Sequence, residues 1–549
     1  MTEFGTATWI PSGNRSLYSW VHLPKSGQAK GAVIIAPPLA REQVISYRTL
    51  RVLAIRLAQQ GWVAIRFAWT GTGESAEMPE STDVVQTWQQ DLASITDFAA
   101  QLVGKERVHA IGLRAGSALL AASDADFQSR LLWEPIGGKT FLRQQSMLRH
   151  VSLDETPVPT ETGIELGGTI YLPHHAQSLS SVPHPGKLPA ADLPRGSQIV
   201  IEKDQDVAKA FYAVASIFAT VPTESVQNLI GLLPKNAQQI QLPEWSPLRT
   251  AEVSVPGFSQ PILEEILELG PNKLPSVLSR PIELSQAAPG SALLVAASSE
   301  PKEGVTALWV LQARRLAAQG IPAIRAERRG SGDLGALEAL RDPNPYTDEA
   351  IEDIKNVCAY LDDRFEGPVS GIGLCAGAWL VGMASKDSAM QKVIMLNNVA
   401  WRDQVAYYNR IYAELNVEEL LAGERRSADG QEPKTFKSRV KSLLRKFGPY
   451  WLWLGLGKRA ITNVPEVLMD FSSREAELIL HLGPEDYRLF AMERGEEGLK
   501  RLLKQGRQIQ LRMEQPLDHA LLAHISRTKA IEIIESTLLQ EPAEPSAIR

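Results

Sequence analysis

The sequence predicts an α/β fold with two tandem domains, each built on a doubly wound, mostly parallel sheet. Three observations predict it: the length of the chain, an internal repeat, and the alternation of apolar β-rich runs with helical stretches that end in glycine. The chain has 549 residues, whereas one α/β domain takes roughly 100 to 250. One compact core is therefore excluded.

The repeat contains the same three segments in the same order in both halves. One match pairs GAVIIAPP with GSALLVAA, and a second pairs RLAQQGWVAIRFAWTGTG with RLAAQGIPAIRAERRGSG, both at an offset of 259 residues. A third pairs AIGLRAGSALLAA with GIGLCAGAWLVGM at an offset of 261. Because order and spacing persist, we expect one domain over residues 1–280 and a second over 281–549. The proline- and glycine-rich segment 269–290 is expected to be an irregular connection.

Composition excludes several classes of protein. Charged residues make up 22% and hydrophobic residues 44%, the balance of a globular protein rather than a disordered chain. The net charge of -6 gives no reason to expect a nucleic-acid partner. Two cysteines form neither a disulfide framework nor a zinc-ligand pattern, so we expect a reducing compartment, no metal and no cofactor. Neither a signal peptide nor an apolar run of about 18 residues is found, which predicts a cytoplasmic location.

Each half contains the turn Gly-Leu-x-Ala-Gly between a short strand and a helix of small residues, and in the second half the central residue is Cys375. A residue held between glycines at such a turn has a strained backbone and presents its side chain at the carboxyl end of the sheet. This is the nucleophile elbow of the α/β-hydrolase fold, normally Gly-x-Ser-x-Gly. The helix N-terminus favours a thiolate, so Cys375 is the candidate nucleophile. The alternative is an inert cysteine at the start of a helix.

A base is expected after the nucleophile, because this fold supplies its residues in the order nucleophile, acid, histidine. Three histidines follow Cys375. His481 lies within a predicted strand, and His524 falls about one helical turn beyond His519. His519, just after the strand QIQLRMEQ, is therefore the candidate base.

The acid is expected at the end of the strand AELILHL, where Glu485 and Asp486 follow. Asp486 is the preferred candidate and Glu485 the alternative. The sequence thus predicts a catalytic triad of Cys375, His519 and Asp486, whose histidine would activate the thiol while the carboxylate orients the ring.

An oxyanion formed by acyl transfer needs preorganised N–H donors. One is expected from Ala376, the residue after the nucleophile. The second is expected from the loop 297–299 after the strand SALLVAA, with Ser298 as the preferred residue.

The first half lacks this chemistry and is predicted to be a degenerate, non-catalytic copy. Arg114 stands where a nucleophile should be, and a guanidinium is neither nucleophile nor base. The strand QQIQLPEW, which corresponds to QIQLRMEQ, is not followed by a histidine. Arg114 beside a helix N-terminus favours a bound carboxylate or phosphate, with a structural ion pair as the alternative.

The insertion 397–468 lies where the fold carries its lid. Within it, residues 434–459 hold eight basic and no acidic residues. This segment predicts either a lid whose aromatic face covers the pocket or a peripheral contact with an anionic membrane at the inner face. Its aromatic residues are Phe436, Phe447, Tyr450, Trp451 and Trp453.

Four segments resemble a known family: GAVIIAPPLAREQ, TGTGES, GLRAG and LLWEPIGGKTFLRQQ. Over about residues 30–150 they look like the exosortase-system-associated hydrolase-like proteins, which typically show Pro-Pro-Phe-Ala-Glu-Glu, Gly-x-Gly-Asp-Ser and Gly-Leu-Arg-x-Gly. The resemblance implies an α/β-hydrolase fold and a role in bacterial exopolysaccharide or envelope glycan assembly.

The second half is similar to serine-aminopeptidase-like and acyltransferase members of the same fold, with cysteine in place of serine. This resemblance implies an esterase, thioesterase or acyltransferase that acts on a small-molecule, glycan or lipid-linked acyl substrate. A non-catalytic binding or scaffold protein of a carbohydrate pathway is the alternative.

Overall fold

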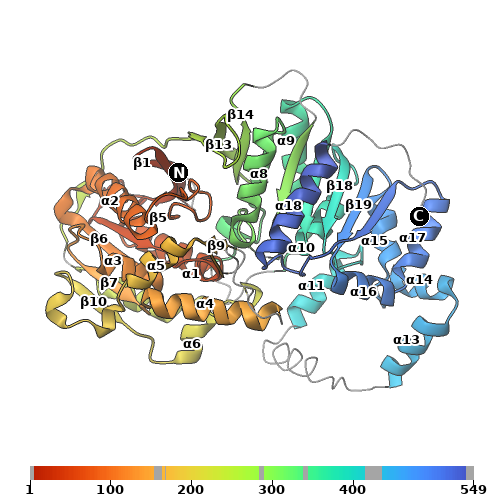
Figure 1. The fold of residues 1–549 in the computed structure, drawn as a ribbon, viewed down its shortest axis with the longest axis horizontal. Coiled ribbons are helices and arrows are strands. Elements are labelled where there is room, and N and C mark those ends of the chain that lie inside the picture. The colour runs from red at the N-terminus through yellow and green to blue at the C-terminus, as the bar shows by residue number, and fades with distance from the viewer. Residues whose placement is uncertain are drawn as a thin grey trace.

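A computed structural model of the chain describes residues 5–153, 163–166, 169–214, 216–235, 237–283, 290–298, 300–337, 344–414 and 436–539. Figure 1 shows two α/β domains side by side, the N-terminal one in red to yellow and the C-terminal one in green to blue. No helix in these ranges is long and apolar enough to cross a membrane.

Seven strands form the main sheet of the first domain within the described ranges. They are β1 (Thr6–Ser12), β2 (Arg15–His22), β4 (Ala32–Ala36), β5 (Val63–Phe67), β6 (Val108–Leu113), β7 (Arg130–Trp133) and β10 (Ser197–Val200). Their order is β1-β2-β5-β4-β6-β7-β10. The hairpin β1-β2 is antiparallel and lies on one edge, and the strands from β5 onward are parallel.

Helices cover both faces of this sheet because its central strands are apolar on both sides. Ile34 of β4 belongs to a core with Trp88 and Leu92, and its neighbour Ile35 belongs to a second core with Leu53 and Leu229. The first pair lies on α2, and the second on α1 and α7. The helices are α1 (Arg41–Gln59), α2 (Val84–Val103), α3 (Ala115–Ala121), α4 (Gly138–Leu153), α5 (Pro173–Ser181), α6 (Gln205–Ala210) and α7 (Thr223–Gly231).

The second sheet has nine strands within the described ranges. They are β12 (Thr250–Val253), β13 (Ile262–Leu269), β14 (Leu274–Pro281), β15 (Ser291–Val295), β16 (Ala323–Ala326), β17 (Val369–Leu374), β18 (Met390–Leu396), β19 (Glu477–Leu482) and β20 (Ile509–Met513). Their order is β12-β13-β14-β16-β15-β17-β18-β19-β20. From β13 onward it repeats the order of the first domain and adds one strand, β20. An edge hairpin followed by this parallel order is the arrangement of the α/β-hydrolase fold, and the predicted fold class is confirmed.

The helices of the second domain also lie on both faces of its sheet. Trp309 of α8 and Ile534 of α18 share one core, whereas Ile354 of α9 and Trp379 of α10 share another. The helices are α8 (Leu308–Ala318), α9 (Asp348–Arg364), α10 (Ala376–Ala384), α11 (Val405–Glu414), α13 (Phe436–Phe447), α14 (Tyr450–Lys458), α15 (Pro465–Ser472), α16 (Pro484–Met492), α17 (Gly495–Lys504) and α18 (His524–Leu539). The predicted lid insertion 397–468 holds α11, α13, α14 and the start of α15, and its part 415–435 lies outside the described residues.

The predicted domain boundary near residue 280 is wrong. Strands β12, β13 and β14 belong to the second sheet, so the second domain begins near Thr250. The predicted irregular segment 269–290 contains the hairpin partner β14, which pairs with β13 along its whole length, from Leu269 opposite Leu274 to Ile262 opposite Pro281. Gly270 and Pro271 form the tight turn after Leu269, and Pro275 and Pro281 lie near the two ends of β14.

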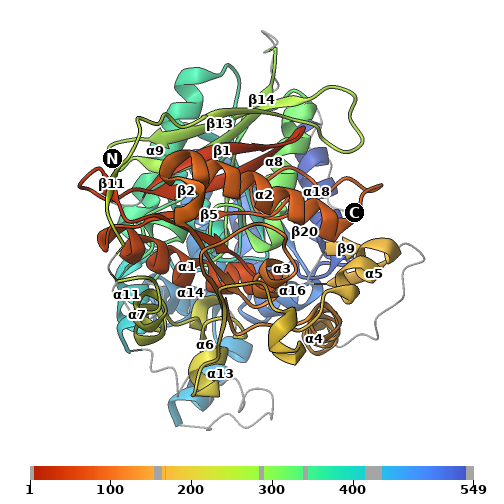
Figure 2. The same cartoon turned by 90° about the vertical axis from the view of Figure 1, so that its left-hand side faces the viewer.

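The edge hairpins of the two domains pack against each other. Trp9 and Trp20 of β1 and β2 share a buried cluster with Val253 and Ile266 of β12 and β13. Figure 2 shows β13 and β14 lying along β1, so the repeated elements meet at this interface.

Two buried ion pairs cross the same interface in reciprocal fashion. Arg66 of the first domain pairs with Asp333 of the second at 2.7 Å, and Arg325 of the second pairs with Glu74 of the first at 2.6 Å. With the repeat offset of 259, Arg66 corresponds to Arg325 and Glu74 to Asp333. Each domain therefore supplies a cation and an anion to the other from equivalent positions.

Glu264 of β13 extends this cluster of charges. It accepts hydrogen bonds from Arg325 Nη2 at 2.9 Å and from Arg314 Nη2 at 2.8 Å. Burial alone would raise the pKa of Glu264, but the two guanidinium groups lower it to about 2. The carboxylate is therefore charged at neutral pH, which compensates the buried arginines.

Because these charges are buried, removing one of them leaves its partner without compensation. We expect Glu74→Gln to lower the free energy of unfolding by about 3–5 kcal/mol, measured by urea denaturation. The control is Glu106→Gln, because the Glu106 side chain is 73% exposed and lies 3.8 Å from Arg107. It should change stability by less than about 1 kcal/mol. Equal effects of the two variants would contradict a structural role for the buried pair.

Candidate active site

Cys375 lies at a sharp turn between β17 and α10. Its φ of 52° and ψ of -113° match those of Arg114 in the first domain, 55° and -119°. Glycines flank the turn for lack of space: a Cβ on Gly373 would lie 2.2 Å from the Gly377 carbonyl oxygen, and one on Gly377 would lie 2.4 Å from that of Val295. The thiol is therefore held at the carboxyl end of the sheet, where it is partly exposed.

His519 connects the thiol to a buried carboxylate. Its Nδ1 lies 2.8 Å from Asp486 Oδ1, and its ring lies close enough to Cys375 for the thiol to affect its pKa. Burial would lower the pKa of His519, but the interactions with Asp486 and Cys375 outweigh it and raise the pKa to about 10. The structure thus brings together the three residues that the sequence predicts as a triad.

The alternative acid and bases lie elsewhere. Glu485 is exposed at the start of α16. His481 is buried in β19, with Nδ1 3.0 Å from Glu514, and the ring of His524 lies 3.5 Å from the Thr528 hydroxyl on α18. Asp486 follows the strand end by one residue more than Glu485, which places it on the inner side of α16, where it is buried.

Asn397 is a positioning residue that the sequence analysis missed. Its buried side chain donates to the carbonyl oxygens of Asp518 at 2.9 Å and His519 at 3.1 Å, and accepts from the Gly483 N–H at 2.8 Å. It therefore ties the loop that carries the base to the turn before α16, which carries the acid. Its φ of 48° suits asparagine better than most residues. The sequence offered one signal for this role, a polar residue directly after the carboxyl end of the strand β18.

The predicted oxyanion donors lie on the same edge of the sheet. Ala376 is the first residue of α10, so its N–H has no acceptor within the helix. Ser298 lies in the loop after β15, which the start of α10 approaches closely, and its φ is 44°. The Ser298 carbonyl oxygen accepts a hydrogen bond from the buried Arg328. This contact orients the loop beside the nucleophile.

Several aromatic side chains lie near Cys375. Tyr346 stacks on Tyr408 with ring centroids 4.2 Å apart and meets Trp379 edge-on at 5.0 Å. Burial raises the pKa of Tyr412 to about 12, and the nearby Cys375 adds to this effect. Tyr408 and Tyr412 lie on α11, so the insertion supplies part of an apolar wall next to the thiol.

The predicted anion site at Arg114 is not formed. The guanidinium Nε and Nη2 each lie 3.2 Å from a carboxylate oxygen of Glu42, and the group stacks 4.2 Å from the centroid of Tyr212. Burial raises the pKa of Glu42, and the charge of Arg114 partly offsets this. Because the cation already has a buried partner in its own domain, the ion-pair alternative holds.

Among the described residues, the first domain has no counterpart of β20, the strand that precedes the candidate base. The segment QQIQLPEW does not extend its main sheet, contrary to the predicted correspondence with β20. Instead β11 (Ile240–Gln241) pairs antiparallel with β3 (Gln28–Ala29) in a separate two-stranded sheet. The edge position that β20 occupies in the second domain is thus not filled by this segment.

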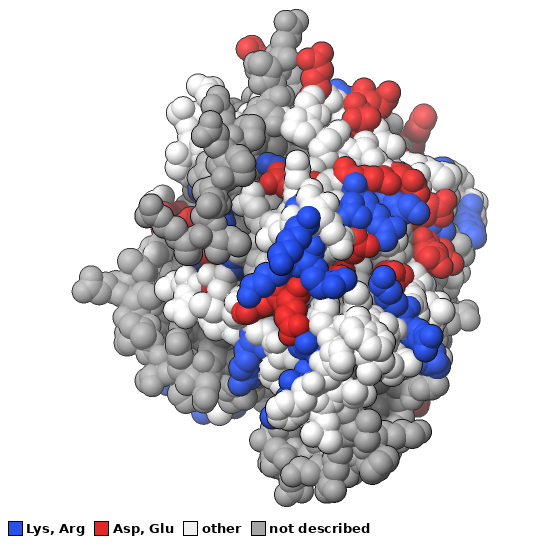
Figure 3. All heavy atoms as spheres, turned by 90° about the vertical axis from the view of Figure 1, so that its right-hand side faces the viewer, with Lys and Arg blue, Asp and Glu red and all other residues white. Residues whose placement is uncertain are grey.

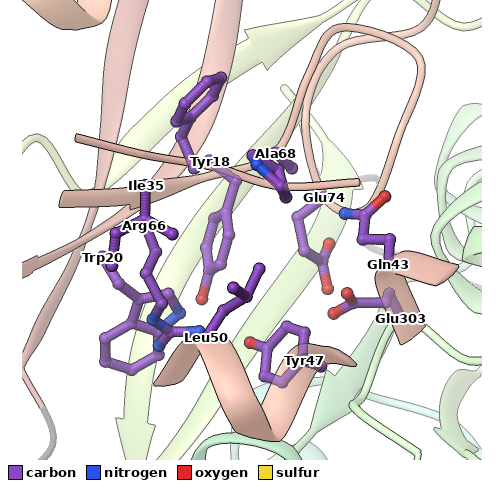
Figure 4. A pocket seen from close by; sticks show the side chains of 12 residues that line it. Tyr18, Trp20, Ile35, Gln43, Tyr47, Leu50, Arg66, Ala68, Glu74 and Glu303 are labelled. Atoms are coloured by element: carbon purple, nitrogen blue, oxygen red, sulfur yellow. The ribbon is translucent and has the colours of Figure 1, made fainter. Parts of the chain in front are cut away.

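Two hollows elsewhere do not suit catalysis. Figure 4 shows the cavity at the domain interface, where Tyr18, Tyr47, Glu74 and Glu303 surround a space of about 40 Å³. That volume holds a water molecule or two but no substrate. A second hollow, of about 690 Å³, lies at the amino-terminal ends of β4 and β5, away from the carboxyl edge that carries Cys375. Lys30 is among its lining residues, and no described carboxylate is. No cluster of possible metal ligands occurs within the described ranges.

No protein-family model and no curated protein matches this chain. An acylaminoacyl peptidase from Pyrococcus horikoshii is similar in structure at 12% identity, over 57% of this chain and 46% of that chain, with a TM-score of 0.34. A dienelactone hydrolase from Anabaena variabilis is similar at 12% identity, over 50% of this chain and 96% of that chain, with a TM-score of 0.31. An esterase from Rhizomucor miehei is similar at 14% identity, over 55% of this chain and 84% of that chain, with a TM-score of 0.31. The fold assignment rests on the strand order described above.

Loss of the Asn397 side chain should separate the acid and base loops. We expect Asn397→Ala to lower the free energy of unfolding by about 1–3 kcal/mol, because buried backbone groups lose their partners. Labelling of Cys375 by an uncharged thiol reagent should also become slower, since His519 is no longer held in place. Asn398→Ala is the control, because that side chain donates only to the nearby Ala400 carbonyl oxygen. Unchanged labelling in Asn397→Ala would contradict the positioning role.

The raised pKa of His519 predicts a pH dependence of stability. The folded protein keeps a proton that the unfolded chain releases above the ordinary pKa of 6.5, so this stabilisation is complete below 6.5 and is lost as the pH rises through about 10. Asp486→Asn removes the strongest hydrogen bond that raises the pKa. The thermal midpoint of the variant, measured by calorimetry, should therefore fall less than that of the parent across this window. Parallel curves would contradict the His519–Asp486 interaction.

Proposed function

We propose that the second domain is a cysteine-dependent acyl-transfer enzyme, an esterase, thioesterase or acyltransferase. The observation that carries this proposal is the series Asp486, His519, Cys375 at a strained turn on the carboxyl edge of the sheet, in which Asp486 hydrogen-bonds with His519 and His519 lies beside Cys375. A buried carboxylate, a partly exposed imidazole and a thiol in this order match the roles of orienter, base and nucleophile.

In the first half-reaction, His519, whose raised pKa lets it hold a proton at neutral pH, keeps the proton of the thiol while the Cys375 Sγ attacks the carbonyl carbon of an ester or thioester. The N–H of Ala376, with a donor from the loop that contains Ser298, stabilises the oxyanion. When the tetrahedral intermediate collapses, the bond to the leaving group breaks, and His519 returns its proton to the departing alcohol or thiol. The acyl group is now a thioester on Cys375.

In the second half-reaction, His519 takes a proton from the incoming nucleophile, which attacks the thioester carbonyl. Water yields a free acid, and a hydroxyl or amine yields a transfer product. The C–S bond then breaks, and the Cys375 sulfur recovers its proton from His519. Hydrolysis and transfer therefore differ only in the acceptor.

The surroundings of the thiol favour an apolar acyl group. Tyr346, Tyr408 and Tyr412 form an aromatic wall beside it, and such walls bind hydrocarbon better than charge. For the acceptor we propose a hydroxyl or amine of a bacterial exopolysaccharide or envelope glycan, on the basis of the resemblance of residues 30–150 alone. The first domain, with its paired Arg114, would serve as a non-catalytic scaffold.

Acylation of the cysteine tests this function. After incubation with a panel of activated esters and acyl-CoA thioesters, intact mass measurement should show one acyl adduct, lost in Cys375→Ala and kept in Cys358→Ala. His519→Ala should slow single-turnover acylation by about 10³-fold or more. Asp486→Asn should slow it as well, with the fold retained. An adduct that persists in Cys375→Ala, or none with any donor, would overturn the proposal and favour a non-catalytic binding protein.

The two cysteines should also differ in reactivity with iodoacetamide at neutral pH. Burial raises the pKa of Cys358 to about 12, whereas Cys375 is partly exposed. Because the thiolate is the reacting form, Cys375 should be alkylated first. Peptide mass mapping over time measures the order, and first labelling of Cys358 would contradict the nucleophile assignment.

A further inference from the structure

We infer that the corner between α13 and α14 is a surface that binds an anionic membrane. We call this surface the tip. It consists of the exposed apolar side chains of Leu443, Phe447 and Trp451 and the exposed Lys446 at the corner, together with the exposed Lys458 and Arg459 at the far end of α14.

The apolar side chains of the tip are unusually exposed. The exposed fractions are 59% for Leu443, 80% for Phe447 and 69% for Trp451. Leu443 and Phe447 are four residues apart and share one face of α13. Trp451 lies in the first turn of α14, just past the Gly448–Pro449 corner. Three large apolar groups thus gather where one helix ends and the next begins.

The opposite face of these helices is firmly packed. Trp453 and Leu454 of α14 form a buried cluster with Val464 and Val467, and Leu444 of α13 packs against it. The Trp453 indole N–H also donates to the Glu493 carbonyl oxygen at 3.2 Å. The helical corner is therefore anchored to the domain through its inner side, while its outer side has no protein cover among the described residues.

The charge of this segment suits an anionic surface. Residues 434–459 contain eight basic and no acidic residues. Arg445 pairs with Glu493 at 3.2 Å, whereas Lys446, Lys458 and Arg459 are exposed. Figure 3 shows that basic and acidic side chains are interspersed on the right-hand side of the molecule. The excess of positive charge thus belongs to the insertion and not to that face as a whole.

Exposed tryptophan and phenylalanine beside lysine and arginine are typical of helices that lie in a membrane interface. The aromatic rings enter the headgroup region, and the cations attract acidic lipids. Figure 1 shows α13 extending away from α14, with the corner at the end of α13 that is nearer the domain.

The tip lies at the same end of the domain as the candidate active site. Figure 1 places α13 below α11 and α16, which carry Tyr412 and Asp486. A protein bound through the tip would therefore have its catalytic edge next to the bilayer, where an acyl chain or a lipid-linked glycan is available. Membrane binding itself needs no catalytic residue, so it can be tested independently of the proposed function.

The test is co-sedimentation of the full-length protein with vesicles of phosphatidylcholine alone or with 30% phosphatidylglycerol. We expect binding to the anionic vesicles, weak binding to the neutral ones, and weakening by added salt. Phe447→Ser with Trp451→Ser should reduce binding by about tenfold or more, because the buried apolar area is lost. Lys446→Glu with Lys458→Glu should reduce binding to anionic vesicles only.

The matched control is Leu248→Ser with Ile525→Ser, since these side chains are 46% and 59% exposed and lie outside the tip. It should bind vesicles as the parent does. Full binding by the Phe447, Trp451 variant would overturn the proposal. So would a parent protein that ignores all vesicles but self-associates through the tip in sedimentation velocity, because the surface would then be a protein contact. Loss of Cys375 acylation with vesicle binding intact would refute only the proposed function.

Discussion

Burial of four reciprocal charges at the domain interface is the constraint on which the two-domain arrangement depends. Arg66 pairs with Asp333 and Arg325 pairs with Glu74, and in each pair the partner belongs to the other domain. Neither domain could expose this face to another environment without leaving charges unpaired, so the two halves act as one body. Because the positions correspond within the repeat, the contact has the self-complementary pattern of a two-fold dimer, built here into a single chain.

The two domains have the same backbone geometry at the strand-to-helix elbow, but they place different side chains there. The elbow has a left-handed φ in both, at Arg114 and at Cys375. In the first domain the side chain at the elbow is engaged by Glu42. In the second it meets His519, which the extra strand β20 and the following loop bring to the sheet edge. The elbow alone therefore does not define a catalytic site, because its partners come from elements that only one copy has.

The insertion gives the second domain two properties that the first lacks. Its helix α11 supplies aromatic side chains near the thiol, and its helices α13 and α14 carry exposed aromatic and basic side chains. Both follow from one stretch of sequence between β18 and β19. At the end of β18, Asn397 also connects the loops of the acid and the base. The aromatic surroundings of the thiol and the alignment of Asp486 with His519 thus depend on neighbouring parts of the chain.

The sequence by itself determined the duplication, the fold class and the three residues at the elbow edge, because these follow from local patterns: repeated segments, strand–turn–helix alternation and the order Cys375, Asp486, His519. The sequence did not show that the proline-containing segment Leu274–Pro281 is the strand β14. That strand is defined by its pairing with β13 and β16, and β16 lies more than 40 residues further along the chain. The partner of Arg114 was equally hidden, because Glu42 lies 72 residues away. Only the tertiary structure decided these points, and it also revealed Asn397 and the reciprocal ion pairs, whose roles depend on contacts between segments distant in sequence.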